Sequence, residues 1–159
     1  MLRTRVGSRP LSIQVSAWRP DSGPGGIGVV APAVGPGQSS RVYEQVHGSR
    51  EELTYRAVLR SLELAEEIGA RRVRILCPDE SVTRQINREE PVPQGGRLPL
   101  LYIRVKAMMY TFERAEVAAV PEGRVRAAQR LAQAASRIPP RIKRPEPQTL
   151  LPMDLTPAA

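Results

Sequence analysis

The side chains best suited to chemistry in this sequence are its arginines. All but Lys106 and Lys143 of the 24 cationic side chains are arginine, and the formal net charge is +8. A guanidinium group binds phosphate through a planar fork of N–H donors, so this charge balance favours an acidic partner such as nucleic acid. A GC-rich genome would explain the arginines equally well. About half of the excess charge lies within residues 1–20, which contain no acid and four arginines: Arg3, Arg5, Arg9 and Arg19.

Nucleophiles and metal ligands are sparse. Cys77 is the only cysteine, which excludes an internal disulfide, and its apolar neighbours predict a buried strand, so we expect it in the core. His47 is the only histidine and lies at a predicted strand end, where we expect it near the surface. The glycine-rich segment at Gly23 precedes a predicted strand and lacks the lysine of a phosphate-binding loop, so it predicts a tight hairpin instead. These residues predict no metal site and no cofactor.

Alternating and helical apolar patterns place these side chains on a succession of strands and helices. We expect strands over residues 11–17, 27–31, 40–47, 72–77 and 115–120, and helices over 50–68, 79–87, 99–112 and 124–138. The strongest of these signals is the first helix. Ser49 followed by Glu52 is a capping box at its start, and Gly69 is the residue type that ends helices. The stretch from Met108 to Tyr110 is expected to lie in the core on its helix.

The length of 159 residues, with 41% hydrophobic and 25% charged residues, is typical of one globular domain with tails. We predict a basic arm over residues 1–10, a folded domain over 11–138 and a disordered proline-rich tail over 139–159. No apolar run approaches the roughly 18 residues of a membrane span. The start of the chain lacks the apolar segment of an export signal, so we expect a cytoplasmic protein that does not contact a membrane.

Four stretches, in this order, resemble the ribonuclease H-like superfamily. They are GPGGIGVV from Gly23, YRAVLRSLELA from Tyr55, the segment from Val73 to Asn87, and the segment from Val120 to Ala132. With the intervening gaps the resemblance spans residues 11–138. It implies an α/β fold in which three antiparallel strands are followed by two parallel strands, giving a five-stranded mixed sheet flanked by helices.

Active members of this superfamily hold two Mg²⁺ ions with four carboxylates, which stabilise the attacking water and the leaving oxygen. The resemblance places these four acidic positions on neutral residues: Val15, Thr54, Pro78 and Gln129. Asp79 directly follows the third of them. The asparagines that contact substrate in the family correspond to Arg50 and Glu51. The resemblance therefore implies the fold without conventional ribonuclease activity.

We accordingly predict a catalytically inactive nucleic-acid-binding module for RNA or an RNA/DNA hybrid, with no catalytic residue, metal or cofactor. The candidate contacts are chosen by their position near the family's cleft and by the absence of neighbouring acids: Trp18, Arg19, Arg50, Arg84, Arg124 and Arg126. Packing in the core is the preferred expectation for Trp18, and stacking on a base is the alternative.

Two other functions remain open. The domain could be a scaffold for protein contacts or dimerisation, with the apolar TLLPMDL segment at 149–155 as a docking motif, and the oligomeric state is undetermined. Alternatively, Asp21, Glu51 and Asp79 could form a relocated Mg²⁺ site in a divergent metal-dependent ribonuclease H.

Overall fold

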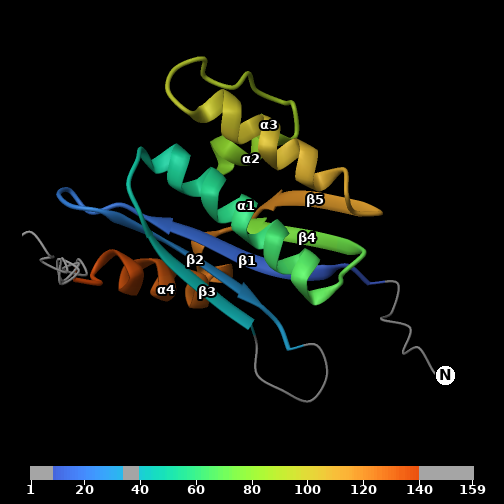
Figure 1. The fold of residues 1–159 in the computed structure, drawn as a ribbon, viewed down its shortest axis with the longest axis horizontal. Coiled ribbons are helices and arrows are strands. Elements are labelled where there is room, and N and C mark those ends of the chain that lie inside the picture. Colours follow the sequence, from blue (N-terminus) through green and yellow to red (C-terminus); the bar gives the residue numbers. More distant parts are fainter. Residues whose placement is uncertain (1–8, 34–39, 140–159) are drawn as a thin grey trace, which may run out of the picture.

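The computed structural model describes residues 9–33 and 40–139 (Figure 1). The predicted tail and most of the predicted basic arm lie outside these residues. The elements follow the predicted order: β1 (Leu11–Trp18), β2 (Gly25–Ala31), β3 (Ser40–Val46), α1 (Arg50–Ile68), β4 (Arg72–Cys77), α2 (Glu80–Ile86), α3 (Leu98–Met109), β5 (Arg114–Ala119), a 3₁₀ turn (Glu122–Arg124) and α4 (Arg126–Ser136). Within the described residues no helix is long and apolar enough to cross a membrane.

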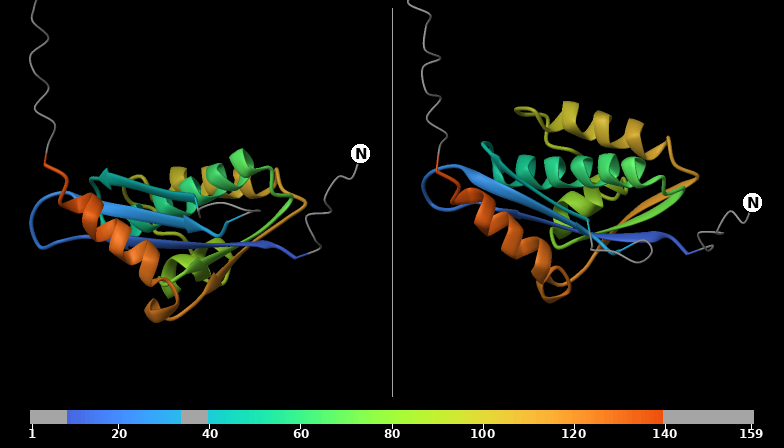
Figure 2. Two further views of the ribbon diagram at one scale, coloured as in Figure 1. Left: turned by 90° about the horizontal axis from the view of Figure 1, so that it is seen from below. Right: turned by 60° about the horizontal axis from the view of Figure 1, so that its bottom comes forward.

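The five strands form one mixed sheet in the order β3-β2-β1-β4-β5. β1, β2 and β3 are antiparallel, while β4 pairs in parallel with both β1 and β5, as predicted. Helices α1 and α3 lie on one face of the sheet and α4 lies on the other (Figures 1 and 2). The main core lies between the sheet and α1.

Helix α1 has the predicted bounds because both of its ends are capped. The Ser49 hydroxyl accepts a hydrogen bond of 3.2 Å from the Glu52 backbone N–H. Gly69 ends the helix with a φ of 81°, a left-handed conformation that costs glycine little. The apolar face that the spacing predicted is buried, with Leu53 and Leu62 fully inaccessible.

Helix α4 packs directly on the backbone of β2 because that strand has glycines where the helix crosses it. Gly26 and Gly28 are two residues apart and so present the same face of the strand. A Cβ atom at either position would lie 2.1 Å from a carbonyl oxygen of α4, that of Ala132 or Ala128. The close contact holds α4 at the end of β1. Gln45 of β3 secures the other end of the helix by donating to the Ile138 carbonyl at 2.8 Å.

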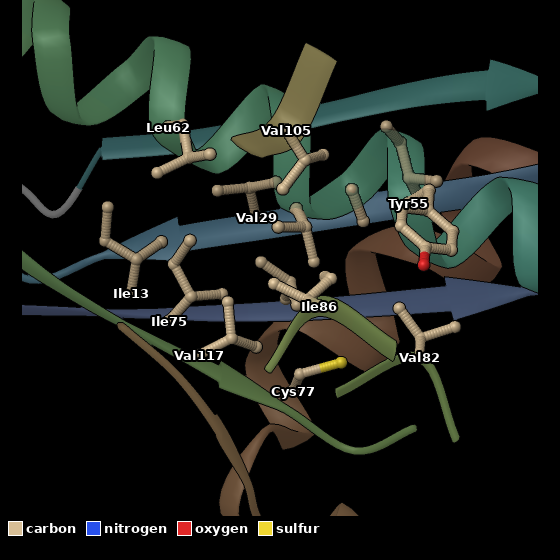
Figure 3. Close-up of a cluster of buried hydrophobic side chains, with 14 of the residues drawn as sticks. Ile13, Val29, Tyr55, Leu62, Ile75, Cys77, Val82, Ile86, Val105 and Val117 are labelled. Atoms are coloured by element: carbon tan, nitrogen blue, oxygen red, sulfur yellow. The ribbon is translucent and has the colours of Figure 1, made fainter. Parts of the chain in front are cut away.

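Tyr55 of α1 lies among the apolar side chains of the main core (Figure 3), where it makes a polar contact with α2. The Tyr55 hydroxyl donates to Gln85 Oε1 at 2.8 Å, and both side chains are buried. Burial raises the pKa of Tyr55 above its ordinary value, and the nearby Tyr102, Glu51 and Asp79 raise it further. Cys77 is fully buried, as predicted, and burial likewise raises the pKa of its thiol.

Substitution of Tyr55 by phenylalanine should change how stability depends on alkaline pH. Between pH 10 and 12 the unfolded wild-type chain loses the Tyr55 proton while the folded chain keeps it, so its free energy of unfolding falls by up to about 1.4 kcal/mol per pH unit. Tyr55→Phe removes this decline, although near neutral pH it costs about 1–3 kcal/mol because Gln85 loses its buried partner. Urea unfolding of both proteins at pH 8, 10 and 11 measures the difference. Parallel pH profiles would contradict this prediction.

Two sequence expectations are wrong. Tyr110 was expected in the core, but it is the C-cap residue of α3 and 74% of its surface is exposed. The last helix was expected to begin at Arg124, whereas a 3₁₀ turn ends there and α4 begins at Arg126. Val125 separates the two with a non-helical φ of −125°. Its side chain is buried beside Val30 and Ala128, and this contact sets the break in the backbone.

Candidate nucleic-acid interface

A cleft opens where β1 and β4 separate. Their ladder ends at the pair Gln14 and Leu76, and beyond it β1 continues to Trp18 beside β2 alone. Open α/β sheets bind ligands in such crevices at the carboxyl ends of their strands. The cavity measures about 280 Å³. It is lined from β1, α1, the β4–α2 junction and the α4 region by Ser16, Ala17, Trp18, Arg19, Arg50, Thr54, Pro78, Asp79, Glu122, Val125 and Gln129.

Asp79 is the best-anchored polar residue of the cleft. Its Oδ1 accepts a hydrogen bond of 3.0 Å from the Val82 backbone N–H and so caps α2. Its Oδ2 lies 3.4 Å from the Thr54 hydroxyl, whose single proton it shares with the nearer Arg50 carbonyl, at 3.0 Å. These bonds hold the carboxylate in place and compensate part of its charge.

The structure brings together three of the four residues that the resemblance aligns with the family's metal-binding carboxylates. Thr54, Pro78 and Gln129 line the cleft. Val15 does not: its side chain is fully buried in the main core, and its neighbour Ser16 lines the cleft instead, because successive residues of a strand face opposite sides of the sheet. The end of β4 does bring one carboxylate to the cleft, that of Asp79, one residue after the expected position.

Three of the six predicted nucleic-acid contacts line the cleft, namely Trp18, Arg19 and Arg50. Arg124 and Arg126 are exposed on either side of the lining residue Val125. Arg84 does not line the cleft: it is on α2, where its guanidinium forms ion pairs with Glu80 and Glu90. Glu80 precedes Arg84 by four residues on α2, so this pair could have been anticipated from helical spacing, whereas Glu90 lies beyond the end of the helix.

The expectation for Trp18 is also wrong. It was expected to pack in the core, but 37% of its surface is exposed at the end of β1. The physical reason is that β1 extends past its ladder with β4, so no strand covers the indole on that side.

Sequence reasoning also missed Glu122 and Val125, which reach the cleft through the 3₁₀ turn before α4. The turn has no periodic signal that could have revealed them.

The three carboxylates considered for a relocated metal site, those of Asp21, Glu51 and Asp79, do not form one in the structure. Among residues 9–33 and 40–139, no three histidine, cysteine, aspartate or glutamate side chains come close enough together to hold a metal ion. Asp79 lines the cleft, whereas Glu51 and Asp21 do not. His47, as expected, is exposed.

A second surface feature lies on α3, away from the cleft. Leu100, Ile103 and Tyr110 are exposed by 61%, 62% and 74%, and their spacing places them along the outer side of the helix. Of these three residues, Ile103 also lines a hollow of about 620 Å³ between α3 and residues 85–94.

Known proteins share this sequence pattern and this fold. Residues 15–135 match the family described as reverse transcriptase-like. The search of curated proteins found no match. The N-terminal RNase H domain of Rv2228c from Mycobacterium tuberculosis, solved as a fusion with maltose-binding protein, is 24% identical with a TM-score of 0.69, covering 79% of this chain and 94% of that one.

Two further structures have the same fold. RNase H1 from the halophilic archaeon Halobacterium salinarum NRC-1 is 18% identical with a TM-score of 0.72, covering 80% of this chain and 97% of that one. LC11-RNase H1 in complex with an RNA/DNA hybrid is 19% identical with a TM-score of 0.70, covering 79% and 96%. These likenesses confirm the predicted ribonuclease H-like fold, and the match over residues 15–135 shows that the chain belongs to the reverse transcriptase-like family.

Proposed function

We propose that this chain is a catalytically inactive ribonuclease H-like domain that binds nucleic acid, RNA or an RNA/DNA hybrid, in the cleft at the end of β1. The observation that carries the proposal is the placement of Arg19 and Arg50 in this cleft. The cleft also contains Thr54 and Gln129, neutral residues that the sequence resemblance aligns with acidic positions of active ribonuclease H-like proteins. Guanidinium groups bind phosphate, and neutral side chains at these positions reduce the repulsion of phosphate that Mg²⁺ would otherwise offset.

The donor set of the cleft supports the absence of two-metal chemistry. Two Mg²⁺ ions require several carboxylate oxygens close together. Only Asp79 and Glu122 among the described lining residues are acids, and Asp79 already caps α2 through its Oδ1. These residues do not fit a two-metal centre, so we assign no reaction step to a metal ion.

Charges beside the cleft extend the surface available to a phosphate backbone. Helix α4 has no acidic residue, and Arg126 and Arg130 are exposed one turn apart on it, with Arg124 just before. Phosphate contacts of this kind give affinity without sequence specificity. LC11-RNase H1, a structural neighbour, has been solved with an RNA/DNA hybrid, which makes that ligand a reasonable candidate here.

A scaffold for protein contacts is the second candidate function. It is favoured by the exposed apolar side chains on α3, because such a face commonly marks a contact surface. The apolar tail segment 149–155, which the sequence suggested as a docking motif, lies outside the described residues.

Titration of three labelled ligands tests the proposal: single-stranded RNA, duplex DNA and an RNA/DNA hybrid, each at 50 and 200 mM salt with Mg²⁺ present. We expect binding to RNA or hybrid that weakens with salt, with no cleavage products on a gel. Metal-dependent cleavage would contradict the inactive assignment. Absence of binding to all three ligands at low salt would overturn nucleic-acid binding and favour the scaffold.

A further inference from the structure

Trp18 is the only tryptophan of the chain, and it is not part of the buried core. Its side chain is 37% exposed. An indole normally contributes to folding through its large apolar surface. Exposure at the rim of a cleft therefore suggests that this surface serves a ligand.

The position of Trp18 follows from the strand register. Trp18 lies opposite Gly26 in the antiparallel ladder of β1 and β2. Opposed residues of such a ladder point to the same face, and the absent Cβ of Gly26 points toward α4. Trp18 is therefore on the α4 side of the sheet, and glycine opposite it provides no side chain to cover the indole.

The cleft surrounds this indole with groups that match the parts of a nucleotide. Arg19, directly after β1, and Arg50, at the start of α1, line the same cavity as Trp18. A planar aromatic face suits a nucleobase, and a guanidinium group suits a phosphate. The cavity of about 280 Å³ lies just below the roughly 300–1,000 Å³ of ligand pockets, a size that suits a small ligand such as one nucleotide.

Base pairing decides which nucleic acid can use such a platform. Inside a duplex the faces of each base are covered by its stacked neighbours, and only an unpaired base can offer a face to an indole. We propose that Trp18 is a stacking platform for an unpaired base of single-stranded nucleic acid whose phosphates contact Arg19 and Arg50. This inference rests on the proposed function and narrows its ligand to a single strand.

The single tryptophan makes the test direct, because intrinsic fluorescence reports on Trp18 alone. A 12-nucleotide single-stranded RNA and the same sequence as an RNA/DNA hybrid are titrated into the full chain at low salt. Affinity is measured separately by anisotropy of the labelled oligonucleotides. We expect the single strand to quench Trp18 fluorescence with the same Kd that anisotropy gives.

Two variants separate stacking from charge. Trp18→Leu should weaken single-strand binding by roughly 5- to 100-fold, the effect of removing one base–aromatic stack, while hybrid binding changes by less than about 2-fold. Trp18→Phe keeps an aromatic face and should have an intermediate affinity. Thermal melts of both variants show whether they are folded, and the wild-type fluorescence titration requires no substitution.

The outcomes distinguish this inference from the proposed function. Salt-dependent anisotropy binding with unchanged Trp18 fluorescence would overturn the stacking platform and leave nucleic-acid binding intact. An equal loss of single-strand and hybrid affinity in Trp18→Leu would overturn the preference for an unpaired base. Absence of anisotropy binding to either ligand at low salt would overturn both.

Discussion

Gly28→Ala is expected to lower the free energy of unfolding by about 3 kcal/mol, a large part of the 5–15 kcal/mol typical of a small domain. The added Cβ would lie 2.1 Å from the Ala128 carbonyl oxygen and 2.8 Å from the Ala132 backbone nitrogen. Both atoms belong to the backbone of α4, so no side-chain rotation can relieve the clash. The helix must move away from β2, which opens the interface between them.

Gly95→Ala is the matched control, since a Cβ at Gly95 meets no atom within 4 Å. It should change the free energy of unfolding by no more than about 0.5 kcal/mol. Thermal and urea unfolding measure both variants, with a decrease of roughly 10 °C in Tm expected for Gly28→Ala. Equal stability of the two variants would show that α4 does not pack on β2 as closely as described.

Arg19→Gln combined with Arg50→Gln is expected to weaken nucleic-acid binding by roughly 10- to 100-fold at 50 mM salt, because the double variant lacks two cationic hydrogen-bond donors. Both residues line the cleft, Arg19 directly after β1 and Arg50 as the first residue of α1. Removal of one phosphate-binding cation also reduces the slope of log K against log salt concentration by about 0.7–0.9. The slope should therefore fall by about 1.5 in the double variant.

Arg71→Gln with Arg114→Gln removes the same net charge at the opposite end of the sheet, where β4 and β5 begin. This control should retain most of the affinity and salt slope of the wild type. Anisotropy titrations at several salt concentrations compare the two double variants. Equal reductions in both would mean that the net charge, and not the cleft, determines binding.

Much of the fold could be predicted because each element has a local signal. Alternation of apolar residues located the five strands to within about two residues, and Ser49 and Gly69 located both ends of α1. Such signals depend on neighbours in the chain, which the sequence displays directly. The start of α4 was predicted less well, because the break at Val125 depends on a contact with Val30 of a distant strand.

The candidate site was predicted only in part. Trp18, Arg19 and Arg50 were named from the sequence and line the cleft, but nothing in the chain indicated that Trp18 would be exposed or that Ser16 would replace Val15 in the lining. Both depend on where the ladder between β1 and β4 ends. Arg84 was chosen for its position; its pair with Glu80 follows from helical spacing, but its pair with Glu90 is visible only once α2 and the following loop are in place.

By itself, the sequence determined the order of strands and helices, the caps of α1, the excess of arginine and the neutral residues Thr54 and Gln129, because these depend on residue type and short spacing. Only the tertiary structure decided which of these residues meet. The separation of β1 from β4 opens the cleft, and the close packing of α4 on Gly26 and Gly28 brings Gln129 to it. Both are contacts between residues far apart in the chain, which local patterns do not encode.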